Sequence, residues 1–550
     1  MSCRILASNF DGEIMTTFRM PIVNVLLVVL LLLSVFCAKM YAQVTVNITT
    51  GPIVGQTLDG DPAVNVFKGI PYAAPPVGKL RWREPQPVTA WDSPRDCTNF
   101  APRCPQPDMS DRPWLGEAGP MDEDCLYLNV WAPAKVDKPR PVMVWIHGGG
   151  FTIGAASLRF YDGLSLAKQG VVLVSINYRL GPLGFFGHPA LTDESEHHVS
   201  GNYGLLDQIA ALQWVQNNIA QFGGDPNRVT IFGESAGSVA VTCLMVSPLA
   251  KGLFHRAIAQ SGTGASLHQY LDQSLLRGKS LHETGVTLAG KLGIQGQDAN
   301  ALAALRKVSA AKLLNVSDPQ LISQGLKGTK FGPVIDGYVL PGNPGTLFAE
   351  GKQHAVPLMI GANAQDGILH ASALPIKRVR GYEWIIKGMF KDDASAILSL
   401  FPAQTNADVR GALLDLMTVS AFVAPSRRLA AAMQNTNTPA YLYHFSRVSP
   451  GAKRAGVGAA HGAEIPYVFN TFKNNRTYEA TDHQLADVMQ QYWVNFATNG
   501  DPNADGLATW PAYTPGTDEH MDFGNTANVG KNLHKQACDL FDKIAGHTDY

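Results

Sequence analysis

The amino-acid sequence predicts an α/β fold with a large, mostly parallel central sheet flanked by helices. From about residue 140 onward, short uninterrupted apolar runs alternate with longer stretches whose apolar residues recur at helical spacing. Uninterrupted apolar runs are typical of strands buried on both faces, as in parallel sheets. Their alternation with helical stretches indicates that the chain winds repeatedly between sheet and helix.

The expected strands share this continuous apolar pattern, as in "PVMVWI" and "AYLYHF". They cover residues 141–146, 171–177, 228–232, 256–260, 357–362 and 440–445. The clearest expected helix is "YGLLDQIAALQWVQNNIAQF" at 203–222. Before residue 140, proline-rich stretches such as "GIPYAAPPVGKLRW" predict turns and edge strands packed onto the sheet.

Two mostly helical segments, 266–330 and 370–435, lie between the late strands. We expect them to form helical excursions over one end of the sheet. Because ligands of open α/β sheets bind at the carboxyl ends of the strands, these excursions should wall the binding pocket.

Composition limits the class of protein. The chain has 550 residues, 45% of them hydrophobic, which excludes a disordered or collagen-like chain. The 44 basic and 45 acidic residues nearly cancel and form no basic stripe, so we expect no nucleic-acid partner. Length alone suggests several domains, but one enlarged α/β domain over residues 43–550 is the expected organisation.

The N-terminus resembles a targeting segment. The uncharged run "PIVNVLLVVLLLLSVFC" at 21–37 follows Arg19 and precedes "KMYAQ". This predicts a signal peptide within residues 1–42, cleaved after Ala42, and a secreted or periplasmic protein. An uncleaved membrane anchor is the alternative. Met15 and Met20 are alternative starts to Met1, and we expect no stable membrane span in the mature protein.

The sequence has seven cysteines. Two lie in or before the apolar run, and export makes disulfides plausible among the other five, Cys97, Cys104, Cys125, Cys243 and Cys538. An odd number leaves at least one free thiol. No C-x-x-C pair or Cys/His cluster occurs, so no metal is expected. Sequons begin at Asn47, Asn315 and Asn475.

A candidate nucleophile lies in "TIFGESAGSVA" at 230–240, where Ser235 stands between two glycines. G-x-S-x-G alone is a weak signal and could be an ordinary glycine-rich turn. Here a buried strand precedes it and a small-residue helix follows, as in a sharp strand-to-helix turn that exposes a serine hydroxyl. The nearby run "WIHGGGF" at 145–151 could supply backbone N–H donors for an oxyanion, although a flexible turn is the alternative.

A serine alcohol needs a base, and in this arrangement the acid and the histidine follow it in the chain. His461 in "GAAHGAEIPYVF" is the best candidate base, since His147 precedes the serine and His444 lies in a strand pattern. Asp366 follows a strand in "NAQDG" and is the preferred acid. Asp336 is the rival, although its turn suggests local hydrogen bonding.

Several motifs together resemble the type-B carboxylesterase/cholinesterase family of α/β-hydrolases. They are "GIPYAAPPVGKLRW", "EDCLYLNVW", "WIHGGGF", "INYRLGPLGF", "GNYGLLDQIAALQWVQNNIAQFGGDPNRVTIFGESAG" and "HGAEIPYVF". The resemblance implies the α/β-hydrolase fold, Ser235 as nucleophile and His461 as general base and acid. It also implies an oxyanion hole from the amides of Gly149, Gly150 and Ala236. The chain departs from the family at Asp366, where glutamate is usual.

The resemblance implies further contacts. Three residues match a buried polar network behind the histidine: Glu234, Ser261 and Glu464. For Glu464, capping of the next segment is the alternative. Cys104 and Cys125 match the family's early disulfide, while Cys243 and Cys538 are expected to be unpaired. Two pairs match structural ion pairs: Arg81–Glu123 and Arg179–Asp207.

The sequence therefore predicts a serine esterase that hydrolyses carboxylic esters through an acyl-enzyme on Ser235, without metal or organic cofactor. A soluble, apolar ester of short or moderate acyl length is the expected small-molecule substrate. A lipase-like preference is disfavoured by the short loop of twenty residues between Cys104 and Cys125. A cholinesterase-like preference would need Trp114 to bind a cation, but a packing role fits it better. A non-catalytic binding or adhesion role is the alternative from another class.

Overall fold

The computed structural model describes residues 42–108, 119–274, 278–318, 329–472 and 477–546. The predicted signal peptide up to residue 41, Trp114 and Asn475 lie outside the described residues. Residues Gln43–Tyr550 form one compact unit, built around a 13-stranded sheet.

The sheet is parallel at its centre and antiparallel at its edges. Its strands are β1 (Ala42–Ile48), β2 (Gly51–Leu58), β3 (Val64–Pro71), β4 (Arg95–Asp96), β5 (Tyr127–Pro133), β6 (Arg140–Ile146), β7 (Val172–Ile176), β8 (Gly224–Glu234), β9 (Arg256–Gln260), β10 (Leu358–Asn363), β11 (Ala440–Phe445), β12 (Glu519–Phe523) and β13 (Ala527–Lys531). Their order is β1-β2-β3-β5-β7-β6-β8-β9-β10-β11-β12-β13, with β4 paired to β2. Neighbours from β7 to β12 pair in parallel, which confirms the expected sheet.

All six expected strands are present, as β6 to β11. Two regions differ from the expectation. β5 is not an edge strand: it lies between β3 and β7 and pairs antiparallel with both, and its side chains are almost all buried. At the other edge, β12 and β13 extend the sheet beyond the last expected strand as an antiparallel pair.

The sheet separates two hydrophobic cores because successive side chains of a strand point to opposite faces. In β6, Val142 and Val144 enter one core, whereas Met143 and Trp145 enter the other. The first core is completed by α5 (Tyr203–Asn218), α6 (Ala236–Leu244), α10 (Pro344–Ala349) and α15 (Ala424–Ala432). The second is completed by α2 (Leu164–Lys168), α17 (Ile465–Phe469) and α18 (Ala480–Asn499). This layering confirms a sheet flanked by helices.

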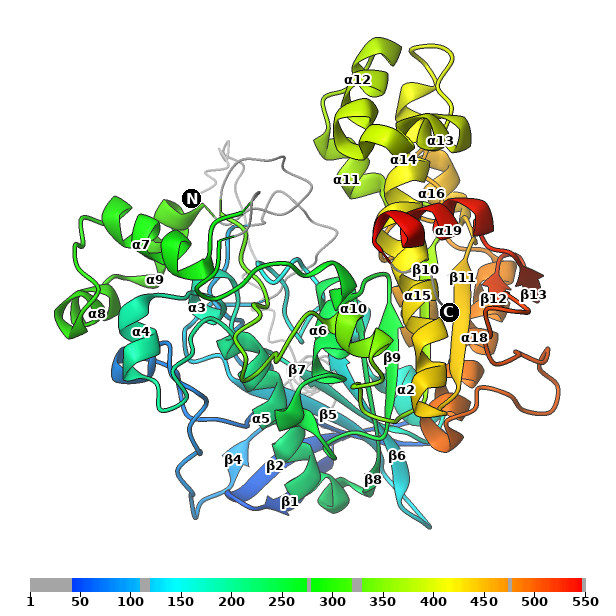
Figure 1. The fold of residues 1–550 in the computed structure, drawn as a ribbon. Coiled ribbons are helices and arrows are strands. Elements are labelled where there is room, and N and C mark those ends of the chain that lie inside the picture. The colour runs from blue at the N-terminus through cyan, green and yellow to red at the C-terminus, as the bar shows by residue number, and fades with distance from the viewer. Residues whose placement is uncertain (1–41, 109–118, 275–277, 319–328, 473–476, 547–550) are drawn as a thin grey trace, which may run out of the picture. The chain divides into compact units, whose positions relative to one another are not determined.

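The two expected helical excursions are also present. Between β9 and β10 the chain forms α7 (Leu281–Lys291), α8 (Ala299–Arg306) and α9 (Ala310–Ser317). Between β10 and β11 it forms α11 (Ile368–Ala373), α12 (Val379–Phe390), α13 (Ala394–Leu400) and α14 (Val409–Thr418), which are grouped together in Figure 1. These helices share a third core with α19 (Lys535–Ile544). The remaining α-helices are short: α3 (Gly181–Gly184), α4 (Pro189–Glu194) and α16 (Pro450–Arg454).

One helical stretch in the described part of the chain, Val409–Thr436, is long and apolar enough to cross a membrane. It is mostly buried inside the protein, with 61% of its most apolar window covered, as expected for a core helix.

The expected covalent and ionic links are in place. Cys104 and Cys125 form a disulfide, while Cys97, Cys243 and Cys538 are free and buried. The guanidinium of Arg179 donates to both carboxylate oxygens of Asp207, at 2.8 and 2.7 Å, in a fully buried pair. Arg81 likewise makes two hydrogen bonds to Glu123. The Arg179–Asp207 pair ties the loop after β7 to α5, and the Arg81–Glu123 pair ties the segment after β3 to the loop before β5.

Candidate active site

Ser235 lies in the sharp turn between β8 and α6. Its φ of 57° and ψ of −121° are values that a residue with a side chain rarely adopts. The turn is held by close packing: a Cβ on Gly237 would stand 2.0 Å from the carbonyl oxygen of Ile146. The Ser235 N–H donates to the Gln260 carbonyl at 2.8 Å. Tight backbone contacts therefore fix this serine at the carboxyl end of β8.

His461 and Asp366 come together from loops that follow two adjacent parallel strands. Asp366 follows β10 and His461 lies beyond β11. His461 Nδ1 is 2.7 Å from Asp366 Oδ1, and this carboxylate is completely buried. The other oxygen, Oδ2, accepts the N–H of Asn363 at 2.7 Å. The two loops are also joined by the N–H of Gln365, which donates to the Ala459 carbonyl.

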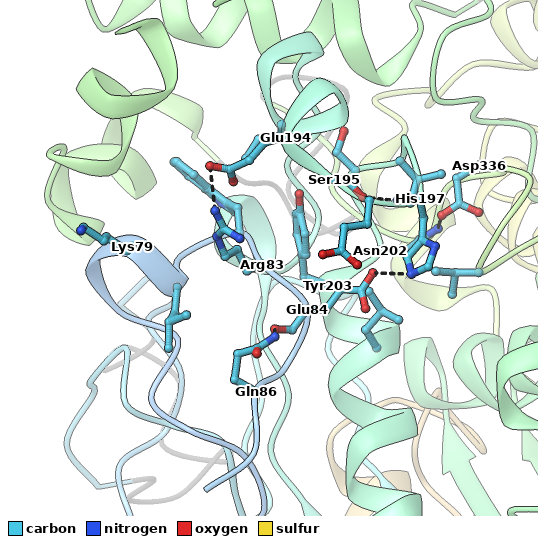
Figure 2. A pocket seen from close by; sticks show the side chains of 18 residues that line it. Lys79, Arg83, Glu84, Gln86, Glu194, Ser195, His197, Asn202, Tyr203 and Asp336 are labelled. Atoms are coloured by element: carbon cyan, nitrogen blue, oxygen red, sulfur yellow. Dashed lines mark hydrogen bonds and ion pairs between the residues drawn. The ribbon is translucent and has the colours of Figure 1, made fainter. Parts of the chain in front are cut away.

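Asp336, the rival acid, has the local role that its turn suggested. Its Oδ1 accepts the N–H groups of Tyr338 and Leu340, at 3.0 and 2.9 Å. Its Oδ2 accepts a hydrogen bond from Asn202 at 2.8 Å. It lines a separate cavity of about 490 Å³, in which Glu194 pairs with Arg83 and Glu84 faces His197 (Figure 2). None of Ser235, Asp366 and His461 lines that cavity.

Glu234, immediately before Ser235, contacts the imidazole of His461 on the side opposite to Asp366. Its Oε1 lies 3.2 Å from His461 Nε2, and its side chain is buried. Burial favours the neutral imidazole, but the carboxylates of Glu234 and Asp366 outweigh this effect and raise the pKa of His461. Burial in turn raises the pKa of Glu234, because a buried carboxylate loses its hydration. His461 therefore lies between two carboxyl groups.

Glu464 anchors the buried polar network behind these residues. Its Oε1 accepts from Gln260 at 3.0 Å and its Oε2 from Asn363 at 2.6 Å, the residue that also holds Asp366. This contact network accounts for the buried carboxyl better than capping of the next helix, since Glu464 makes no side-chain cap there. Ser261, by contrast, places its hydroxyl beside the phenol of Tyr443 rather than on a carboxylate.

The glycine loop after β6 packs against the serine turn. A Cβ on Gly148 would lie 3.1 Å from the Ser235 Cβ, so the two segments are in contact. Gly149 has a φ of +113°, and a Cβ there would collide with the Ile153 carbonyl oxygen at 2.1 Å. Among the described residues, the N–H groups of Gly149, Gly150 and Ala236 donate to no protein acceptor.

The other histidines weighed in the sequence lie elsewhere. His147 is buried under the glycine loop and stacks on Tyr178, and burial lowers its pKa to about 4. His444 lies in β11, paired with Asp522.

Sequence reasoning missed Asn363, which links Asp366 to Glu464, and the aromatic Phe422, whose ring centre lies 5.3 Å from that of His461. It also missed His370, which packs on Phe422. Position in the chain is the one available signal: Asn363 ends β10, and His370 follows Asp366 by four residues.

Comparison with known proteins identifies the family. The model of the carboxylesterase family matches residues 42–541, nearly the whole chain. The chain belongs to the carboxylesterase family. It is 41% identical over 488 residues to fumonisin B1 esterase of Sphingopyxis macrogoltabida, covering 86% of each chain. It is 36% identical to para-nitrobenzyl esterase of Bacillus subtilis, covering 86% of this chain and 93% of the relative.

Carboxylesterase 1C of Rattus norvegicus is 35% identical, over 89% of this chain and 91% of the relative. The fold is thus the α/β-hydrolase fold, and this carboxylesterase is a carboxylic ester hydrolase. Among the described residues, no three His, Cys, Asp or Glu side chains are grouped as metal ligands.

The substitution Glu234→Gln should lower the pKa of His461 by about one unit or more, because it removes a carboxylate that stabilises the imidazolium. The measurement is an NMR pH titration of the His461 ring carbon signals. Glu519→Gln, on β12 and away from His461, is the matched control and should leave the titration unchanged. An unchanged His461 titration in Glu234→Gln would show that this contact does not set the pKa.

Proposed function

We propose that this carboxylesterase hydrolyses small esters through a covalent acyl-enzyme on Ser235, with His461 as general base and Asp366 as its orienting acid. The 2.7 Å contact between His461 Nδ1 and Asp366 Oδ1, beside the strained serine turn, is the observation that carries this proposal. A serine alcohol is a weak nucleophile at neutral pH, so it needs a base held in one tautomer. A buried carboxylate on Nδ1 provides that restraint.

The proposed reaction has two steps. Ser235 attacks the ester carbonyl while His461 Nε2 takes the hydroxyl proton, and the imidazolium then protonates the departing alcohol. In the second step, His461 takes a proton from water, which attacks the acyl-enzyme and releases the carboxylic acid. Because the Nδ1–H donates to Asp366, the lone pair that accepts the proton is on Nε2, and Glu234 Oε1, 3.2 Å from that nitrogen, then stabilises the imidazolium.

The negative charge on the carbonyl oxygen needs donors already in place. We assign this role to the N–H groups of Gly149, Gly150 and Ala236. Their freedom from protein acceptors and the packing of the glycine loop against Ser235 support the assignment. Ala236 is the first residue of α6, where N–H groups have no partner within the helix.

Aspartate serves as the acid at a position where the family usually has glutamate. Its side chain is one methylene shorter, so the loop must approach the histidine more closely. The pairing of Gln365 with the loop before His461 supports this, because it draws the two loops together beside the carboxylate. The Asn363 N–H then fixes the carboxylate from the other side.

For the substrate we propose a small, water-soluble ester. Fumonisin B1 and p-nitrobenzyl esters, named for two relatives, are the first compounds to assay. Lipase-like and cholinesterase-like preferences are the alternatives, and an acyl-length series of p-nitrophenyl esters beside acetylthiocholine separates them.

We also propose that the protein is exported, and that the mature chain is a single domain without a stable membrane span. The disulfide between Cys104 and Cys125 supports an oxidising compartment. The most apolar long helix is mostly buried, which supports the absence of a span.

The predicted signal peptide and its cleavage site are tested by N-terminal sequencing of the protein recovered from a secreting host. We expect Gln43 as the first residue, because cleavage after Ala42 leaves the rest of β1 intact. Recovery of the uncut chain in the membrane fraction would instead support the anchor.

A non-catalytic binding role is tested by covalent labelling. A fluorophosphonate should label the folded protein stoichiometrically at Ser235, because the activated hydroxyl attacks phosphorus as it attacks a carbonyl. Peptide mass spectrometry locates the label, and Ser235→Ala should abolish it. Absence of labelling in folded wild-type protein would favour the binding role.

The acid is tested by paired substitutions. Asp366→Asn should lower kcat for p-nitrophenyl butyrate by about a thousandfold or more, because the amide favours the wrong imidazole tautomer. Asp336→Asn is the matched control and should change kcat by less than about threefold, since Asp336 is hydrogen-bonded to Tyr338, Leu340 and Asn202 rather than to His461. The reverse pattern would assign the acid to Asp336.

A further inference from the structure

One residue at the end of β10 holds the segment that carries His461 from two sides. The side-chain amide of Asn363 donates to the carbonyl oxygen of Ala460 at 2.8 Å, and Ala460 directly precedes His461. The same Nδ2 donates to Glu464 Oε2 at 2.6 Å, three residues after His461. His461 therefore lies between two positions of the chain that a single side chain fixes.

The backbone of Asn363 holds the partner of the histidine. Its N–H donates to Asp366 Oδ2 at 2.7 Å, and its carbonyl oxygen accepts the N–H of Asp366 at 3.2 Å. The other oxygen, Asp366 Oδ1, lies 2.7 Å from His461 Nδ1. One residue thus acts on both ends of this contact, through its backbone at the acid and through its side chain at the histidine.

The Asn363 amide contributes through its N–H donors. Its Oδ1 is buried and accepts no hydrogen bond among the residues that the structure describes. A buried acceptor without a partner costs free energy, because it forfeits its hydrogen bond with water. The opposite orientation of the amide would set Oδ1 against the Ala460 carbonyl, and two acceptors form no hydrogen bond. The two donated hydrogen bonds therefore account for an asparagine at this position.

Glu464 is held on its other side, so it can anchor the histidine segment. Its Oε1 accepts from Gln260 Nε2 at 3.0 Å, and Gln260 Oε1 accepts the indole N–H of Trp493 at 3.1 Å. An indole N–H only donates, which fixes the orientation of the Gln260 amide. All three side chains are completely buried. These hydrogen bonds join β9 and α18 to the segment after β11.

The length of the acid must match the spacing that these contacts fix. A glutamate at position 366 would place its carboxylate about 1.5 Å farther from the backbone, the length of one added C–C bond. The His461 segment could accommodate it only by moving away, and the two hydrogen bonds of the Asn363 amide resist that movement. The N–H of Gln365, which donates to the Ala459 carbonyl, acts in the same direction.

We propose that Asn363 is a positioning residue that holds His461 at the spacing an aspartate spans, so that Asn363 and Asp366 act as a matched pair. This inference rests on the proposed roles of Ser235, Asp366 and His461. The amide contacts none of the reacting atoms. It acts through the histidine, by keeping Nδ1 against the carboxylate and the imidazole in one orientation.

A double-mutant cycle tests the pairing, with hydrolysis of p-nitrophenyl butyrate as the readout. Asn363→Ala should lower kcat by about thirtyfold and change KM by less than about twofold, because a misplaced base slows the chemical step. Asp366→Glu alone should lower kcat by about a hundredfold. In the Asn363→Ala background, the same Asp366→Glu change should cost about tenfold or less, because the released segment can move to fit the longer acid.

Asn218→Ala is the matched control. Asn218 is also buried, and its side chain is hydrogen-bonded to the backbone of Thr49 and Trp214 rather than to the candidate site. Its loss should lower the melting temperature without changing kcat or the cost of Asp366→Glu. Asn363→Ser, which keeps one donor in a smaller side chain, replaces Asn363→Ala in the cycle if that variant does not fold.

The proposal is overturned if Asp366→Glu costs the same factor in both backgrounds, or if folded Asn363→Ala keeps the wild-type kcat. Fluorophosphonate labelling and Asp366→Asn separate this failure from that of the proposed function. Labelled enzymes whose losses simply multiply overturn the pairing alone, whereas an unlabelled wild-type enzyme overturns the role of Ser235. Full activity in Asp366→Asn would instead overturn the role of Asp366.

Discussion

The arrangement of the candidate site depends on the parallel pairing of β8, β9, β10 and β11. Parallel strands end at the same edge of a sheet, so Ser235 after β8, Asp366 after β10 and His461 beyond β11 meet at one edge. Beyond the ends of β10 and β11, the loops that follow them stay together through the N–H of Gln365, which donates to the Ala459 carbonyl, and through the contact between His461 and Asp366. The order and pairing of these strands therefore determine which loops, and which side chains, lie close together in the candidate site.

Much of this arrangement could be predicted from the sequence, because buried parallel strands appear as uninterrupted apolar runs. The strands β6 to β11 and the position of Asp366 after β10 follow from that pattern. β12 was missed because "EHMDF" mixes polar and apolar residues, as a short strand near a sheet edge does. β5 was missed because its surroundings are rich in proline and suggest an edge. Asn363 and His370 gain their contacts only when distant loops meet, so nothing in the sequence beyond their positions in the chain points to them.

Burial of several carboxyl groups around one imidazole is the main electrostatic feature of the site. Asp366 is satisfied by His461 and by a backbone N–H, and Glu464 by two side-chain amides. Glu234 lacks such amide donors among the described residues, and its contact is with His461. Burial raises the pKa of Glu234, and the protonation of the glutamate and that of the histidine depend on each other.

The helices between β10 and β11 pack into a core of their own, which meets the sheet at Ala362. This core reaches the candidate site through Phe422, whose ring lies beside that of His461. A substitution in α12 or α13 therefore acts first on the packing of this core and only through it on the strands. Relatives can accordingly differ in these helices while the parallel strands and the residues that follow them stay the same.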